Sequence, residues 1–353
     1  MDQIRVMIVE DSRVVREYLQ YVIDRDPRLK VVAAVESGEE ALQRMHEVAP
    51  DVISMDIRLP GLDGFQTTQR IMAELPTPIV VVSASVESED LKISMNALRA
   101  GALAVVEKPV ATTHADYASL AARLCTQLAI MSQVKVIRQR AGRASGLERR
   151  PPIANSSRGH SVRVPTGPFG VLALGGSAGG PNAWARIRGS LPGDFPAPVL
   201  LVQHITASFQ SGFVSWLNDI SPLTVLNSED GDNLRRGVVH VAPPDRHLVV
   251  ERERLRLETG PVFCQQRPSG TVLLESLARS WGRMAVAALL TGMGNDGAEG
   301  LASMRLAGGY TIAEDESTAV VYGMPGAAVR LGGVCESLPL GAIADRIRDL
   351  FAP

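Results

Sequence analysis

The chain has 353 residues, of which 45% are hydrophobic and 21% charged, values typical of a globular protein long enough to form two domains. Its formal net charge of −2 gives no indication of binding to nucleic acid. Three cysteines (Cys125, Cys264 and Cys335) lack the spacing of a metal site, so we expect a reducing, cytoplasmic compartment. The apolar run near the N-terminus is short for a signal peptide, and we expect no direct membrane insertion because no apolar run approaches the length of a bilayer span.

The first part of the chain, from Ile4 to about Ile130, alternates short apolar runs with amphipathic segments. Continuous apolar strands followed by helices predict a parallel sheet covered on both faces, here a flavodoxin-like (βα)5 arrangement. The expected strands are residues 6–9, 31–35, 52–55, 79–83 and 104–107. The expected helices are residues 14–25, 39–47, 65–74, 89–100 and 114–130.

Polar residues stand where these strands end. Glu10 and Asp11 follow the first strand, Asp56 follows the third, Ser83 ends the fourth and Lys108 follows the fifth. Three carboxylates at one edge of a sheet would repel one another unless a cation lay between them, and oxygen ligands suit Mg²⁺. That ion would also neutralise charge on a phosphoryl group carried by Asp56. One such acid alone is usually a turn or cap residue, but the set indicates a phosphorylation site.

With these residues, the first part resembles the receiver domain of bacterial response regulators over nearly its full length. The resemblance implies that a histidine kinase supplies the phosphoryl group of Asp56. It implies a Mg²⁺ site made by the side chains of Glu10, Asp11 and Asp56 with the backbone carbonyl of Arg58. Ser83 and Lys108 would form the switch, and the Lys108–Pro109 peptide bond would be cis. One departure is Val105, which stands where receivers usually have Tyr or Phe.

Between Val134 and Pro168 the chain loses periodicity and carries eight basic residues against a single acid, Glu148. A basic segment that contains proline and has no apolar face predicts a flexible tether. A basic run can also bind nucleic acid or an anionic membrane, but aromatic residues and helical periodicity are missing here. We therefore expect a first domain at residues 1–130, a basic linker at 131–168 and a second domain at 169–353.

The second domain begins with a strand, Phe169 to Leu174, that runs into Gly175-Gly-Ser177-Ala-Gly179-Gly-Pro and an expected helix at 182–188. Glycines on both sides of Ser177 permit a sharp turn that exposes its hydroxyl, the pattern of a strand-to-helix nucleophile turn. The helix N-terminus would offer N–H groups to an oxyanion. A dinucleotide-binding turn needs Gly in place of Ser177 and a P-loop needs Gly-Lys-Ser/Thr, so the remaining alternative is a structural strand–helix turn.

A nucleophilic serine needs a base, and the base needs an orienting acid. His204 follows the apolar strand 199–203, and Asp296 follows the buried run 285–290. His240 lies inside a strand-like run, which is typical of a structural histidine, and nothing assigns a role to His247. Asp296 on its own would also fit a helix cap. Ser177, His204 and Asp296 together predict a catalytic triad, in a chain order that differs from that of the α/β-hydrolases.

From Phe169 onward the chain resembles the chemotaxis protein-glutamate methylesterases. The motifs that carry this resemblance are Gly176-Ser-Ala-Gly-Gly180, Gln203-His204, Val241-Ala-Pro243, Arg267-Pro-Ser269, Leu290-Thr-Gly-Met-Gly-Asn-Asp-Gly297 and Gly323-Met-Pro325. The resemblance implies a doubly wound α/β domain with a mainly parallel sheet. It implies Ser177 as nucleophile, His204 as base and Asp296 as orienting acid, with the backbone N–H groups of Met293 and Ala178 for the oxyanion. Departures from the family are Glu314, where Gln is common, and the lack of an acid near Gly270.

Taken together, the two resemblances imply a phosphorylation-regulated serine esterase that demethylates glutamate methyl esters on chemoreceptors and so resets adaptation. Some relatives also deamidate receptor glutamines. The resting receiver would cover the Ser177 cleft. A non-catalytic phospho-signalling adaptor that binds receptors is the alternative, and the triad argues against it. A DNA-binding regulator would need a basic recognition helix after the linker, where buried strands and Gly-rich turns stand instead.

Overall fold

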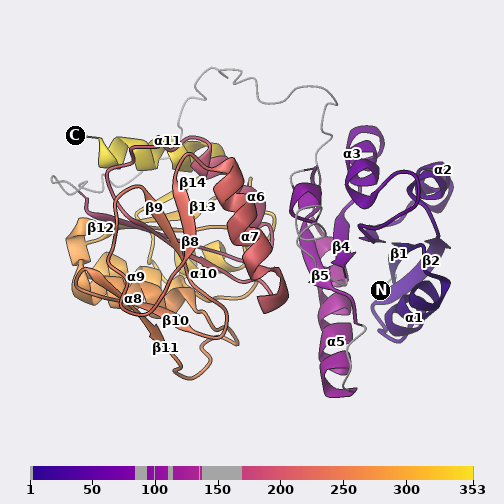
Figure 1. The fold of residues 1–353 in the computed structure, drawn as a ribbon, viewed down its shortest axis with the longest axis horizontal. Helices are drawn as coiled ribbons and strands as arrows, with labels where there is room; N and C mark the ends of the chain where they lie inside the picture. The colour runs from indigo at the N-terminus through magenta and orange to yellow at the C-terminus, as the bar shows by residue number, and fades with distance from the viewer. Residues whose placement is uncertain are drawn as a thin grey trace.

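The computed structural model describes residues 3–83, 94–98, 100–109, 114–134, 136 and 169–352. These residues form two α/β units, each built on its own parallel sheet (Figure 1). The predicted fold class is therefore confirmed for both halves of the chain. Most of the expected linker and part of the expected helix 89–100 lie outside the described residues, although residues 94–98 are helical.

The first unit has five parallel strands in the order β2-β1-β3-β4-β5. Their bounds are β1 (Ile4–Val9), β2 (Leu29–Val35), β3 (Val52–Met55), β4 (Ile79–Ser83) and β5 (Ala104–Glu107). The helices are α1 (Arg13–Asp24), α2 (Gly38–Val48), α3 (Gly64–Glu74) and α5 (His114–Met131). Alternate side chains of β1 lie on opposite faces of the sheet. Val6 and Ile8 pack with α1 and α5, whereas Met7 and Val9 pack with α2 and α3. Burial on both faces explains why residues 6–9 of β1 are all apolar.

The second unit has a seven-stranded sheet in the order β14-β13-β12-β6-β7-β9-β8, with every neighbouring pair parallel. The strands are β6 (Val171–Gly176), β7 (Val199–Gln203), β8 (Thr224–Asn227), β9 (Val238–Val241), β12 (Ala285–Leu289), β13 (Tyr310–Glu314) and β14 (Glu336–Leu338). A separate antiparallel hairpin consists of β10 (His247–Glu251) and β11 (Arg254–Glu258).

The helices of the second unit are α6 (Gly180–Arg188), α7 (Ala207–Ile220), α8 (Gly270–Ser280), η1 (Gly282–Met284), α9 (Ala298–Leu306), α10 (Met324–Arg330) and α11 (Leu340–Phe351). The strand order reverses at β6, which has β7 on one side and β12 on the other. In open α/β sheets, ligands bind beyond the carboxyl ends of the strands at such a switch point. None of the described helices combines the length and apolar character that crossing a bilayer requires.

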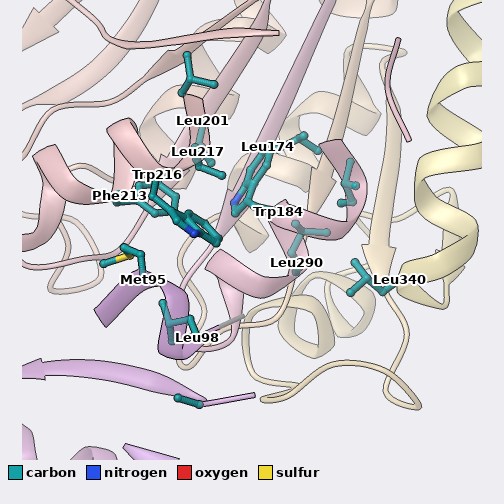
Figure 2. Packing of buried hydrophobic residues seen from close by; sticks show 14 of the residues in the cluster. Met95, Leu98, Leu174, Trp184, Leu201, Phe213, Trp216, Leu217, Leu290 and Leu340 are labelled. Carbon is teal, nitrogen blue, oxygen red and sulfur yellow. The ribbon is translucent and has the colours of Figure 1, made fainter. Parts of the chain in front are cut away.

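The two units pack against each other through apolar side chains. Met95 and Leu98 of the first unit belong to one buried cluster with Trp184 and Phe213 of the second, and Figure 2 shows these four side chains together. The helical residues 94–98 therefore lie beside α6 and α7. This contact brings the edge of the first unit next to the carboxyl end of the second sheet.

Candidate active site

Ser177 lies directly after β6, in a turn whose backbone is held on several sides. Its N–H donates to the Thr291 carbonyl at 3.0 Å, and its own carbonyl accepts from the Gln203 amide at 2.8 Å. Gly179, at φ +78°, caps α6, and a Cβ there would lie 2.7 Å from Val320. Only glycine adopts this conformation readily, and only glycine fits this space. The turn therefore fixes the Ser177 backbone and leaves its side chain at the cleft.

His204 follows β7, and Asp296 lies in the turn after β12. The His204 Nε2 atom is 2.8 Å from Asp296 Oδ2, and both side chains are buried. His204 Nδ1 has no hydrogen-bond partner among the described residues, so it is the ring nitrogen left to accept a proton. No hydrogen bond joins the Ser177 hydroxyl to His204 in this part of the chain, although both residues line one cleft. Such bonds are commonly long before substrate binds.

The Asp296 carboxylate is saturated with donors from the start of α8. Oδ1 accepts from the Ser269 hydroxyl at 2.6 Å and the Thr271 N–H at 3.1 Å, and Oδ2 also accepts from the Gly270 N–H at 2.6 Å. Burial alone would raise the pKa of Asp296, but the His204 contact and these hydrogen bonds hold its pKa below the ordinary value. Asp296 is therefore kept ionised beside His204.

Two backbone N–H groups near Ser177 are available to an oxyanion. Neither the Met293 N–H nor the Ala178 N–H donates a hydrogen bond within the described residues. Both residues line the cleft, and Met293 is half exposed. A Cβ on the neighbouring Gly292 would lie 2.8 Å from the Ser177 Cβ, so the two turns touch. The predicted donors thus lie on the turns that carry or contact Ser177.

The cleft has a volume of about 730 Å³ and contains Ser177, His204 and Asp296 in its lining. One wall comes from the second unit, including the segment 262–267. The opposite wall comes from the first unit, through residues 103–107 around β5 and the α5 residues Ser119 and Arg123. Figure 1 shows α5 and β5 on the side of the first unit that faces the second. The first unit therefore lies over the opening of the cleft.

Among the described residues, two hydrogen bonds join the units close to this wall. The Asn182 amide donates to the Ala102 carbonyl at 3.2 Å. The Ser208 hydroxyl donates to Glu107 Oε2 at 3.0 Å. Val105, the departure from the usual receiver aromatic, also lines the cleft.

The other described histidines of the second unit lie outside the cleft lining. His240 is fully buried in β9, and burial lowers its pKa to about 4, so it is neutral over the ordinary working range of pH. His247 is buried at the start of β10, behind Asp296, where it contacts Ser269. These placements agree with a structural role for His240.

The predicted phosphorylation site is assembled at the carboxyl edge of the first sheet. Ligand oxygens of Glu10, Asp11 and Asp56 all lie within 4.8 Å of one another, which fits a hard divalent cation. Lys108 Nζ lies 2.8 Å from both Asp56 Oδ2 and Glu10 Oε2. Burial raises the pKa values of Glu10 and Asp56. Burial alone would lower the pKa of Lys108, but these two carboxylates raise it.

The remaining predicted receiver residues surround this site. Ser83 is buried at the end of β4, and its carbonyl accepts from the Lys108 N–H at 2.8 Å. Arg58 is exposed two residues after Asp56. The cis peptide bond of the described residues joins Arg267 and Pro268, so the expectation of one before Pro109 was wrong.

The roles of Ser269, Gly270 and Thr271, which bind Asp296, were not predicted from the sequence. A signal for them was present, because Ser269 caps α8 and accepts from the Val272 N–H. A capping serine marks a helix start whose free N–H groups attract a carboxylate. Nothing in the spacing showed that this carboxylate would be Asp296, 27 residues away.

Comparisons with known proteins agree on both halves of the chain. Residues 6–116 match the response regulator receiver domain, and residues 172–347 match the CheB methylesterase. The chain is 50% identical to protein-glutamate methylesterase/protein-glutamine glutaminase 2 of Paramagnetospirillum magneticum, over 99% of this chain and 97% of that protein. It is 41% identical to protein-glutamate methylesterase/protein-glutamine glutaminase 4 of Myxococcus xanthus, over 99% of this chain and 98% of that one.

Among solved structures, the crystal structure of the Thermotoga maritima CheB methylesterase catalytic domain covers 51% of this chain and 98% of its own, with 34% identity and a TM-score of 0.50. The identity to full-length relatives extends over both units and the segment between them. The chain therefore belongs to the protein-glutamate methylesterase/protein-glutamine glutaminase family, with a response regulator receiver domain joined to a CheB methylesterase domain.

Proposed function

We propose that this protein is a phosphorylation-regulated serine esterase that hydrolyses glutamate methyl esters on chemoreceptors and deamidates receptor glutamines, which resets sensory adaptation. The main support for the proposal is that Ser177, His204 and Asp296 line one cleft, at the point where the strand order of the second sheet reverses. Names of the related proteins supply the substrate class. The proposed division is a receiver at residues 1–130, a linker at 131–168 and a catalytic domain at 169–353.

In the proposed reaction, Ser177 Oγ attacks the ester carbonyl carbon while its proton passes to His204 Nδ1. His204 then gives this proton to the leaving oxygen, and methanol departs from the acyl-enzyme. Water attacks the acyl carbon, with His204 again taking the proton and returning it to Ser177. The product is a glutamate carboxylate. With a glutamine substrate, ammonia leaves in place of methanol.

Two features of the site support this chemistry. The ionised Asp296 holds Nε2 of His204 in its protonated form, which leaves Nδ1 as the base, and it stabilises the imidazolium that forms. The free N–H groups of Met293 and Ala178 would bind the negative oxygen of the tetrahedral intermediate, a kind of contact worth about 2.7–4 kcal/mol per donor.

For the receiver, we propose that Asp56 accepts a phosphoryl group from a histidine kinase. Glu10, Asp11, Asp56 and the Arg58 carbonyl would hold Mg²⁺, which supplies charge neutralisation during phosphoryl transfer. Lys108 already contacts two of these carboxylates and would pair with the phosphoryl group, and Ser83 would hydrogen-bond it. The burial of this pocket keeps these interactions strong.

The proposed control is occlusion of the cleft by the unphosphorylated receiver. Glu107, which binds Ser208 across the interface, is the residue before Lys108. A phosphoryl group on Asp56 that takes Lys108 away from Glu10 would displace this end of β5 and weaken the Glu107 contact. An interface preference of about 2.7 kcal/mol is enough to keep the closed state near 99%.

The direct test is methanol release from methylated receptor membranes in the presence of a phosphodonor. We expect Ser177→Ala to lower the rate by several orders of magnitude, because triad residues act as a unit. The fold and the phosphorylation of Asp56 should be unchanged in this variant. Activity within about tenfold of wild type would show that Ser177 is not the nucleophile.

A further inference from the structure

His247 is a buried histidine for which the triad has no use, yet both of its ring nitrogens have partners. The Ser269 N–H donates to Nδ1 at 3.2 Å, and Nε2 lies 2.9 Å from the Pro261 carbonyl. An N–H donor on Nδ1 requires that this nitrogen carry the lone pair, and a carbonyl next to Nε2 requires that Nε2 carry the proton. These contacts select the neutral Nε2–H tautomer.

The partner of Nδ1 is also a partner of Asp296. The backbone N–H of Ser269 donates to His247 Nδ1, and the Ser269 hydroxyl donates to Asp296 Oδ1 at 2.6 Å. The next residue, Gly270, donates its N–H to Asp296 Oδ2 at 2.6 Å. One short chain of contacts thus runs from His247 through the first residues of α8 to Asp296 and then to His204.

The body of α8 is attached to β10 independently of His247. The Ser276 hydroxyl accepts from the Val250 N–H at 2.9 Å, and the Ser280 hydroxyl donates to the Val250 carbonyl at 2.8 Å. Leu273 and Leu277 add apolar packing on the same buried cluster as Leu248. Loss of His247 would therefore leave α8 docked and release only its N-terminal end, where Asp296 is bound.

We propose that His247 is a positioning residue for the esterase reaction: it fixes Ser269, and through Ser269 it sets the orientation of Asp296 and His204. The contact of Nε2 with Pro261 has a second effect, because Pro261 and Ser269 bracket the segment 262–267 that lines the cleft. The His247 Nδ1 contact affects kcat, because it orients Asp296 and His204 through Ser269. The Nε2 contact affects KM, because it holds the segment that lines the cleft. This inference rests on the proposed esterase function.

Two substitutions separate the two contacts. In His247→Asn the side-chain oxygen replaces Nδ1 as acceptor for Ser269 but cannot reach Pro261. In His247→Gln the side-chain amide replaces Nε2 as donor to Pro261 but offers no acceptor near Ser269. His247→Leu removes both contacts, and its thermal unfolding midpoint shows whether the domain still folds. Because Asn and Gln each keep one bond, their comparison stands even if the Leu variant does not fold.

The first measurement is kcat and KM for methanol release by the phosphorylated full-length chain. We expect His247→Gln to lower kcat roughly 10- to 100-fold, the scale of a misplacement of about 1 Å, and His247→Asn to lower it by less than about fivefold. His247→Asn should instead raise KM. Equal kcat values for His247→Asn and His247→Gln, or a greater loss with His247→Asn, would overturn the proposal.

A double variant tests whether His247 acts through Asp296. In an Asp296→Asn background, His247→Gln should lower kcat little further, whereas an undiminished loss would show that His247 does not act through Asp296.

The second measurement needs no esterase activity. A strong His204 Nε2–H bond to a carboxylate gives a low-field proton resonance, which Asp296→Asn should abolish and thereby assign. We expect this resonance to persist in His247→Asn and to shift or vanish in His247→Gln. A resonance unchanged in His247→Gln would contradict the inference. If wild type released no methanol but the resonance behaved as expected, the proposed function would fail while the positioning role of His247 stood.

Discussion

The pKa values of two buried carboxyl groups in the catalytic domain shift in opposite directions because the groups differ in hydrogen-bond donors. Asp296 receives four donors and has a lowered pKa. Glu314 is fully buried and receives the Thr291 N–H on Oε2 at 2.8 Å, while burial raises its pKa. Donors that bind the charged form offset desolvation, and a buried group with few of them has a raised pKa. Asp296 is thereby suited to hold His204, whereas Glu314 is suited to hold the Thr291 backbone next to Ser177.

The contacts of His204 predict an order of effects among substitutions. His204→Gln removes the proposed base and should reduce methanol release nearly as much as loss of Ser177. Asp296→Asn removes the charge that orients His204 and should be damaging by a smaller factor, since it does not contact the reacting atoms. His240→Gln serves as the control, because its side chain is fully buried away from the cleft. A loss in His240→Gln equal to that in the serine variant would mean that the base is misassigned.

Glu314 predicts a pH dependence of stability. Because its pKa is raised in the folded state, the folded protein keeps a proton that the unfolded chain releases, and stability falls as pH rises from the unfolded pKa through the folded one. Glu314→Gln removes this titration. We expect the variant to gain thermal stability over wild type near pH 8 and to gain less near pH 5, measured by calorimetry.

Exposed Glu253 offers the matched control for that experiment, and Glu253→Gln should show no such pH-dependent difference. An equal change in Glu314→Gln at both pH values would contradict the account of Glu314.

At the scale of elements, the candidate active site lies where several strand ends meet the start of one helix. Ser177, His204 and Asp296 follow β6, β7 and β12, which are neighbours at the centre of the sheet. The turn that contains Gly292 packs on the Ser177 turn so closely that a Cβ at Gly292 would lie 2.8 Å from Ser177 Cβ and 2.2 Å from the buried Met324 sulfur. The two turns therefore position each other.

This packing predicts that Gly292→Ala displaces Ser177. A shift of about 1 Å at the nucleophile would lower kcat by up to roughly 100-fold. Gly341→Ala is the matched control, since a Cβ at Gly341 would meet nothing within 4 Å. Methanol release by both variants, with circular dichroism to check folding, measures the effect. Equal rates for Gly292→Ala and Gly341→Ala would show that this packing does not set the position of Ser177.

The elements also show what could be predicted from the sequence. The bounds of β3, β4, β5 and β7 agree with prediction, because each strand is a short run of mainly apolar residues that ends where polar residues and turns follow. The gathering of the candidate residues at strand ends was predictable for the same reason. Three features could not be predicted: the donors of Asp296, which ring nitrogen of His204 binds it, and the contact of His247 with Ser269. Each depends on the packing of α8 against β10 and on distances that no local pattern encodes.

At the scale of the whole molecule, the receiver forms one wall of the catalytic cleft. Its β5 region supplies Val105 and Glu107 to that wall, and Glu107 precedes Lys108, the proposed switch residue. A smaller Val105 in place of the usual aromatic leaves direct contact at the interface as the simplest route for the signal. Cover of the Ser177 cleft by the receiver was predicted from the sequence, but the residues that make the contact were not, because they depend on how the two units pack.

The most direct test of regulated esterase activity compares methanol release from methylated receptor membranes by four proteins. These are the full-length chain without phosphodonor, the same chain with phosphodonor, Asp56→Asn with phosphodonor, and residues 165–353 alone. The account predicts a low rate for the first and third, because the receiver stays over the cleft, and a high rate for the second and fourth, because the cover is moved or removed. A truncated enzyme no faster than the unphosphorylated chain, or an Asp56→Asn variant that the phosphodonor activates, would contradict it.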